Sequence, residues 1–223
     1  MEKKVMFLVM AVALIAGLAL AVPAGPYRLA FVTLPVYQAT ETNIEVYNGW
    51  LQEEANAAGI GIGGIYGDLE WNVIGSTAEV DARDNTGTNP LIDGAGVPVY
   101  LTDGVTMIAA DNADLWDGVI AAPLNTLASG AVTPAHCWAF TGTKTDGTKN
   151  DGGTENNGKY LGYDGEVSQG CGTMPDCWVW KMWCSDPAGT CLPLYALSEI
   201  IPEPATMCLL GLGGLALLRR RNG

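Results

Sequence analysis

The chain has little of two kinds of residue on which many active and binding sites depend. His136 is the only histidine, and lysine and arginine together number 11 against 24 acidic residues in 223 positions. A Ser–His–Asp or Cys–His site would therefore have to use His136. On a strand, His136 and its neighbour Cys137 would point to opposite faces, so they would not form a local dyad. We predict a structural histidine, no catalytic residues and a protein that is not an enzyme.

Positive charge is scarcest in the middle of the chain. Between Val22 and Pro202 the sequence keeps 22 acidic and six basic residues, a net charge of about −16. Nucleic acid and anionic lipid are both bound through basic contacts, so such a surface repels them. We expect no nucleic-acid partner. The charge suits solubility outside the cell, and it would attract divalent cations or basic partners.

The N-terminus has the pattern of a secretory signal peptide. Lys3 and Lys4 precede a 17-residue apolar run at 5–21. Small residues at Ala19 and Ala21 predict cleavage after Ala21 and a signal peptide over residues 1–21, with cleavage after Ala24 as the alternative. An uncleaved anchor is a further alternative, although the run is near the lower limit for spanning a bilayer.

The C-terminus combines a rigid motif, an apolar run and a basic cluster. Spanning ~30 Å of hydrocarbon takes about 20 apolar residues at ~1.5 Å each, so the 14-residue run would be a short transmembrane helix. Basic residues behind such a run favour the cytoplasmic side of the membrane. The three parts are Pro202, Glu203 and Pro204; residues 205–218; and Arg219, Arg220 and Arg221.

This order of parts resembles the PEP-CTERM sorting signal of Gram-negative-type bacteria that secrete exopolysaccharide. The resemblance implies export by the general secretion machinery, transient retention in the inner membrane, and cutting by an exosortase near the Pro-Glu-Pro motif. Residues 201–223 would then be discarded, as the tail of a GPI signal is. The protein would finish in the cell envelope, at the cell surface or in the extracellular matrix. A permanent tail anchor and a terminal helix packed on the domain are the alternatives.

Five cysteines would remain after processing, since Cys208 would leave with the tail. In an oxidising compartment they predict disulfides. The pairing stays open, because five cysteines allow two bridges and leave one thiol over. The last four are spaced more widely than the cysteine pairs of structural zinc sites. The disulfide candidates are Cys137, Cys171, Cys177, Cys184 and Cys191.

Three loops gather the carboxylate and amide oxygens that calcium prefers. Asp, Asn and Gly also make turns, and none of the three loops has the spacing of an EF-hand. We therefore favour turn-forming roles and expect no cofactor, with calcium as the alternative. The clusters are Asp81, Asp84 and Asn85; Asp111, Asp114 and Asp117; and Asp146, Asp151 and Glu155.

Residues 22–200 predict one α+β domain with an irregular antiparallel sheet and one main N-terminal helix. The helix is expected at 43–58, with Thr42 and Glu45 as a capping box and Gly59 as its stop. Pro98 predicts an edge or strand-start position for its strand. A single helical turn is expected at 111–118 and loops at 81–93 and 142–158. Strands are expected at 27–33, 71–74, 97–102, 137–141, 177–183 and 193–198.

The order of short motifs along residues 27–198 resembles the endostatin branch of the C-type lectin-like fold. It runs from Tyr27-Arg-Leu-Ala-Phe-Val-Thr through a helix, Trp71-Asn-Val-Ile-Gly-Ser, Val97-Pro-Val-Tyr-Leu-Thr-Asp-Gly and Trp138-Ala-Phe-Thr-Gly to Leu194-Tyr-Ala-Leu. The resemblance implies a C-type lectin-like domain. Two departures limit it: the sugar-binding triplets of calcium-dependent lectins are absent, and Ser198 stands where that branch has a cysteine.

We therefore expect a non-enzymatic surface or exopolysaccharide-matrix protein. One alternative is a lectin-like carbohydrate binder with its recognition edge at loops 81–89 and 144–158. Trp178 and Trp180 would share a strand face, which suits either the core or sugar stacking, and we favour the core. Trp183 would lie on the other face as the more plausible surface aromatic. The third reading is an envelope hydrolase that uses His136.

Overall fold

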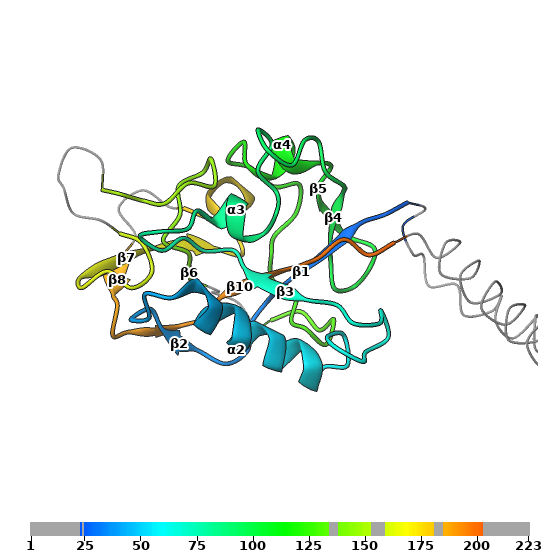
Figure 1. Cartoon of the computed structure of the whole chain (residues 1–223), viewed down its shortest axis with the longest axis horizontal. Helices are drawn as coiled ribbons and strands as arrows, with labels where there is room; N and C mark the ends of the chain where they lie inside the picture. Colours follow the sequence, from blue (N-terminus) through cyan, green and yellow to red (C-terminus); the bar gives the residue numbers. More distant parts are fainter. Residues whose placement is uncertain (1–22, 24, 134–137, 153–158, 181–184, 203–223) are drawn as a thin grey trace, which may run out of the picture.

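A mixed five-stranded sheet forms the centre of the protein (Figure 1). The computed structural model describes residues 23, 25–133, 138–152, 159–180 and 185–202, so the predicted signal peptide and apolar tail lie outside the described residues. Within these ranges the protein is mostly sheet with few helices, and no helix there is long and apolar enough to cross a membrane. In spatial order the strands are β3 (Trp71–Val73), β10 (Tyr195–Ser198), β1 (Arg28–Val32), β4 (Val99–Leu101) and β5 (Met107–Ala109).

The pairing of β1 corrects the expected topology. β1 is antiparallel to β10 but parallel to β4, so the sheet is mixed and the prediction of an antiparallel sheet is wrong at this pair. β4 lies between β1 and β5, which excludes the edge position proposed for its proline. Pro98 instead immediately precedes the strand, and its carbonyl accepts a hydrogen bond from the Arg28 N–H at 2.9 Å. The strand-start interpretation is therefore confirmed.

Helix α2 (Ile44–Ala57) covers one face of this sheet and packs on β3. Its buried side chains include Ile44, Tyr47, Leu51 and Ala55, as the helical spacing predicts. The N-cap is different from the predicted one.

Asn43, not Thr42, caps the helix by accepting a hydrogen bond from the Glu45 N–H at 3.1 Å. The backbone of Glu41 and Thr42 instead packs closely against Gly162. The helix stops before Gly59, which takes the left-handed φ of 75° that glycine adopts without strain.

Side chains of β1 are buried on both faces of the sheet. Leu29 and Phe31 join the cluster under α2, whereas Ala30 and Val32 join a second cluster on the opposite face. That second cluster includes residues of the short helices α3 (Ala82–Asn85) and α4 (Asn112–Leu115). Figure 1 shows α2 on one side of the sheet and α3 and α4 on the other. This double cover explains why β1 is apolar without alternation from Leu29 to Val32.

A second, three-stranded antiparallel sheet lies beside the first. Its order is β6 (Trp138–Phe140), β7 (Glu166–Cys171) and β8 (Ser185–Pro187). A two-stranded ribbon of β2 (Tyr37–Gln38) and β9 (Cys191–Leu192) completes the strands of the described residues. β6 confirms the strand expected at 137–141. The sequence did not predict β2, β5, β7, β8 or β9.

The strand expected at 177–183 is wrong over its described part. Pro175–Cys177 form a short 3-10 helix, η2, closed by a hydrogen bond from the Cys177 N–H to the Met174 carbonyl. Trp178 follows and is fully buried, with its ring 5.8 Å from that of Trp116. The core interpretation of Trp178 is therefore confirmed, and Trp180 packs partly buried against the same cluster. Trp183 lies outside the described residues.

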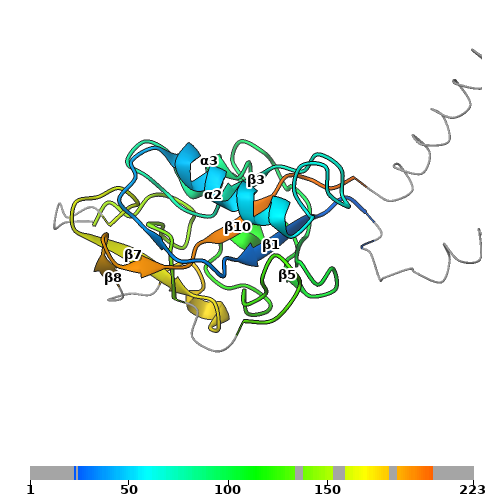
Figure 2. The same ribbon diagram turned by 90° about the horizontal axis from the view of Figure 1, so that it is seen from below.

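The two ends of the described domain are bonded to each other. Tyr27 donates its N–H to the Ile201 carbonyl at 3.1 Å, and Ile201 donates its N–H to the Tyr27 carbonyl at 2.7 Å. Both chain ends therefore leave from one end of the molecule, while β7 and β8 lie at the opposite end (Figures 1 and 2). We call these the terminal end and the distal end.

Candidate functional site

An open hollow of about 600 Å³ lies at the distal end. Three segments line it: Thr40 after β2, residues 162–166 leading into β7, and residues 187–189 at the end of β8. Tyr163 contributes an aromatic ring, and Asp164 and Glu166 contribute carboxylates. Three of the lining residues are glycines: Gly162, Gly165 and Gly189. The hollow therefore combines an aromatic ring with two carboxylates, which accept hydrogen bonds.

Main-chain hydrogen bonds join these three segments. The Ala39 N–H donates to the Ala188 carbonyl at 2.9 Å, and the Ala188 N–H donates to the Gly165 carbonyl at 2.8 Å. The Gly162 N–H donates to the Ala39 carbonyl at 2.8 Å. Gly162 has a φ of 80°, and a Cβ there would lie 2.5 Å from the Glu41 carbonyl oxygen. The close approach of two segments that line the hollow therefore requires glycine at this position.

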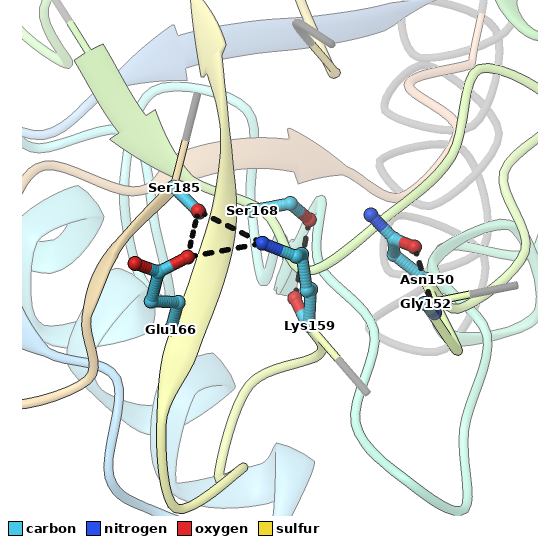
Figure 3. Close-up of polar contacts among 6 residues, drawn as sticks. All are labelled: Asn150, Gly152, Lys159, Glu166, Ser168 and Ser185. Atoms are coloured by element: carbon cyan, nitrogen blue, oxygen red, sulfur yellow. Dashed lines mark hydrogen bonds and ion pairs between the residues drawn. The ribbon is translucent and has the colours of Figure 1, made fainter. Parts of the chain in front are cut away.

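Glu166 lies at the rim of the hollow between two hydrogen-bond donors (Figure 3). Ser185 Oγ donates to Glu166 Oε2 at 2.6 Å, and Lys159 Nζ donates to the same oxygen at 3.0 Å. Lys159 Nζ also donates to Ser185 Oγ at 3.1 Å. The hydrogen bond from Ser185, followed by the hydrogen bond and charge of Lys159, lowers the pKa of Glu166. The carboxylate therefore stays ionised as a fixed acceptor.

The same geometry argues against Ser185 as a nucleophile. An activated serine needs a base that takes its proton. Lys159 donates to Ser185 and cannot accept, and Glu166 is exposed with a lowered pKa, which makes it a weak base. The arrangement positions a carboxylate and does not activate a hydroxyl.

The backbone of Lys159 is fixed from two sides (Figure 3). Ser168, on β7, donates its Oγ to the Lys159 carbonyl at 3.1 Å and its N–H to the same oxygen at 2.9 Å. The Lys159 N–H donates to the Asn150 carbonyl at 2.7 Å, and the Asn150 side chain accepts from the Gly152 N–H at 3.1 Å. The lysine therefore reaches Glu166 from a well-supported position.

The acidic loops that the sequence singled out serve turns, caps and packing. Asp81 accepts from the Lys149 N–H, and Asp84 accepts from the Asn89 side chain. The Asn85 side chain donates a hydrogen bond to the Asn48 side chain of α2. Asp111 caps α4, Asp114 accepts from the Ala110 N–H, and Asp117 accepts from the Val119 N–H. Asp146 accepts from Thr148, and Asp151 pairs with Lys144 at 2.9 Å.

Glu155 lies outside the described residues. Within the described ranges, no three His, Cys, Asp or Glu side chains come together in a way that could hold a metal ion. The turn-forming interpretation therefore accounts for the contacts of these loops.

Three of the five candidate cysteines lie within the described ranges. Cys171 is buried on β7 with its Sγ 3.2 Å from Thr173 Oγ1, and Cys177 donates to Asp176 Oδ1 at 3.4 Å. Cys191 is exposed on β9, and no disulfide joins these three residues to one another. Cys137 and Cys184 lie outside the described residues, as does His136. The predicted disulfides stay a prediction.

The hollow does not coincide with the predicted recognition loops. Residues 81–89 and the described part of 144–158 do not line it. The useful signal was Tyr160-Leu-Gly-Tyr-Asp-Gly-Glu166, where two tyrosines and two carboxylates flank flexible glycines. Tyr160 and Tyr163 meet edge to face with centroids 5.5 Å apart.

Comparison with known proteins identifies the end of the chain. Residues 201–222 match the PEP-CTERM protein-sorting motif. A search of the curated proteins finds no match to this chain. Pro202 is the last described residue, and Glu203, Pro204, the arginines at 219–221 and the signal-peptide residues Ala19 and Ala21 lie outside the described ranges. The motif match supports export of this chain and its sorting by an exosortase to the cell envelope or surface.

Proposed function

We propose that this chain is a non-enzymatic structural or binding protein of the cell surface or exopolysaccharide matrix. The general secretion machinery exports it, the inner membrane retains it transiently, and an exosortase processes it near Pro202–Pro204. One observation carries the proposal. The sorting match begins at Ile201, which among the described residues is the last one with main-chain hydrogen bonds to the fold, so removal of the tail would leave these bonds in place.

The polar contacts of the distal end support a role without catalysis. The polar cluster there, Lys159, Glu166 and Ser185, pairs its own charges and offers no base to a nucleophile. A fixed carboxylate beside a tyrosine ring suits recognition of a ligand through hydrogen bonds and stacking.

Intact mass of the mature protein from its native host tests the proposal. We expect a mass that corresponds to a chain from Val22 to a C-terminus near Pro202–Pro204. A shift on reduction would count the disulfides formed by the five cysteines. A mass that retains Arg219–Gly223 would contradict processing and would make this a membrane-tethered protein.

A second candidate, carbohydrate binding by a C-type lectin-like domain, is favoured by the hollow. Sugars present apolar ring faces and many hydroxyls, so Tyr163 could stack while Asp164 and Glu166 accept hydrogen bonds. Because these contacts need no metal, binding would survive a chelator. Glycan from the host's own exopolysaccharide is the ligand to test first.

Paired substitutions separate this candidate from non-specific binding. Tyr163→Ala should abolish glycan binding and Tyr163→Phe should preserve it. Glu166→Gln should weaken binding, whereas Glu53→Gln makes the same charge change on the exposed face of α2 and should have no effect. Binding that is unchanged in Tyr163→Ala and Glu166→Gln would refute the hollow as the site.

A further inference from the structure

The sorting motif begins where the fold ends, with no linker between them. Ile201 is 5% exposed, belongs to the core cluster under α2 and makes two main-chain hydrogen bonds with Tyr27. Pro202, the next residue, is exposed. The motif match starts at Ile201, so the recognised segment and the folded domain share a residue.

The preceding residues are fixed as well. The Glu199 N–H donates to the Glu70 carbonyl at 3.0 Å, and Ser198 Oγ accepts from the Leu29 N–H at 2.9 Å and donates to the Glu199 carbonyl at 2.7 Å. The C-terminal segment is therefore held by β1 on one side and by the residue preceding β3 on the other. A peptidase that binds residues on both sides of the bond it cuts would find the main-chain groups of this segment already hydrogen-bonded within the domain.

The membrane restricts access from the other direction. The apolar run begins at Ala205, four residues after Ile201. Four extended residues reach at most roughly 14 Å. The predicted membrane segment therefore starts close to the terminal end of the folded domain, and a membrane enzyme has little exposed chain to grip.

We infer that the β-bridge between Tyr27 and Ile201 limits access of the exosortase to its motif, so that processing proceeds from a locally opened state. The inference rests on the proposed function. When opening is fast relative to cutting, proteolysis follows the population of the open form. Opening needs only the release of residues 199–202, because β10 ends at Ser198 and can stay paired with β1 and β3. Contacts that stabilise the bridge then slow release of the protein from the membrane.

A linker insertion tests this inference in the full-length chain. Six Gly and Ser residues placed between Ile201 and Pro202 give the enzyme exposed chain while leaving the bridge intact. Pulse-labelling in the native host, followed by mass or gel mobility, gives the processing rate. We expect processing about tenfold faster than in the unmodified chain, equivalent to ~1.4 kcal/mol. The same six residues between Gly25 and Pro26 lengthen the other chain end and should leave the rate unchanged.

A matched pair of substitutions tests the bridge itself. Ile201→Ala removes a buried side chain and should speed processing, whereas Ile200→Ala removes its 47% exposed neighbour and should not. A thermal unfolding curve of each purified domain confirms that it is still folded. If the insertion leaves the rate unchanged, the inference is wrong, whatever the substitutions do. If no variant and no unmodified chain is processed at all, the proposed function itself is wrong.

Discussion

The terminal end and the distal end of this domain are built in different ways. At the terminal end, β1 is buried on both faces and the chain ends are closed by a bridge between two buried residues, Tyr27 and Ile201. At the distal end, the rim of the hollow consists of exposed turns and short strands joined by main-chain bonds and one polar cluster. Residues with few buried apolar contacts open most easily and are also the ones that meet ligands.

This division has a consequence for a protein that is sorted through its C-terminus. The membrane segments that the sequence predicts would both attach at the terminal end, since both chain ends leave there (Figure 2). The hollow at the distal end would then face away from the membrane before processing. A ligand could therefore reach the hollow whether or not the tail has been cut.

The largest effect is expected from Gly170→Ala on β7. A Cβ at this position would overlap the main-chain carbonyl of Trp178, which cannot move as a flexible side chain can. Overpacking of this kind costs about 3 kcal/mol. Chemical denaturation would measure the loss. Hydrogen exchange would show whether β7 amides lose protection while those of β1 and β10 keep theirs.

Gly49→Ala is the control for that substitution. Gly49 lies inside α2, is exposed, and has no atom within 4 Å of an added Cβ. Alanine should therefore stabilise the protein by about 0.5–1 kcal/mol through helix propensity. Equal loss of protection in β1 and β7 after Gly170→Ala would mean that the two ends unfold as one unit, and would contradict a difference in stability between the terminal and distal ends.

The next effect concerns the polar link between α2 and the central sheet. Asn48 is buried, and its Oδ1 accepts from the Val73 N–H at 2.8 Å while its Nδ2 donates to Asn85 Oδ1 at 3.1 Å. Asn48→Ala leaves the Val73 N–H and Asn85 Oδ1 without their hydrogen bonds to Asn48, which costs about 2 kcal/mol of stability. Denaturation midpoints would check the value. Glu53→Ala, on the exposed face of the same helix, should change stability by less than about 0.5 kcal/mol. A similar loss in both variants would assign the effect to helix propensity instead of to the polar link.

Four of the five strands of the central sheet, all but β5, could be predicted from the sequence because their signals are local. β1 and β10 have apolar sequences bounded by turns, and α2 has buried residues at helical spacing. The parallel pairing of β1 with β4 could not be predicted, because it depends on how the intervening helix and β3 pack. The N-cap at Asn43, in place of the predicted Thr42, also depends on distant contacts. The backbone of Glu41 and Thr42 packs against Gly162, about 120 positions further along the chain.

The hollow could not be predicted because the sequence around it is polar. β7 reads Glu-Val-Ser-Gln-Gly-Cys, yet five of its six residues are buried. Ser168 is tolerated there because the Lys159 carbonyl, nine residues earlier, accepts its Oγ hydrogen bond. At 177–183 the aromatic residues suggested a strand, but Pro175 suits the first turn of a helix and directs the chain into η2. The sorting motif, by contrast, was recognisable because its parts are contiguous.

The smallest expected effect is on the pKa of Glu166, and it tests whether the polar cluster holds this carboxylate in place. Since the pKa of Glu166 is lowered in the folded state, its stabilising contacts are complete above the ordinary glutamate pKa and are lost as pH falls through the lowered value. Ser185→Ala removes the first cause of the shift and should raise the pKa of Glu166 toward the ordinary range, with Lys159 still present. Carbon NMR of the carboxyl group across an acid titration would measure it. Ser168→Ala, whose hydroxyl bonds the Lys159 carbonyl and not the carboxylate, should leave the midpoint unchanged. Because the Glu166 side chain is exposed, the unfolding free energy should barely move. A shifted midpoint with unchanged stability would show that Ser185 positions this carboxylate, whereas an unshifted midpoint would show that it does not.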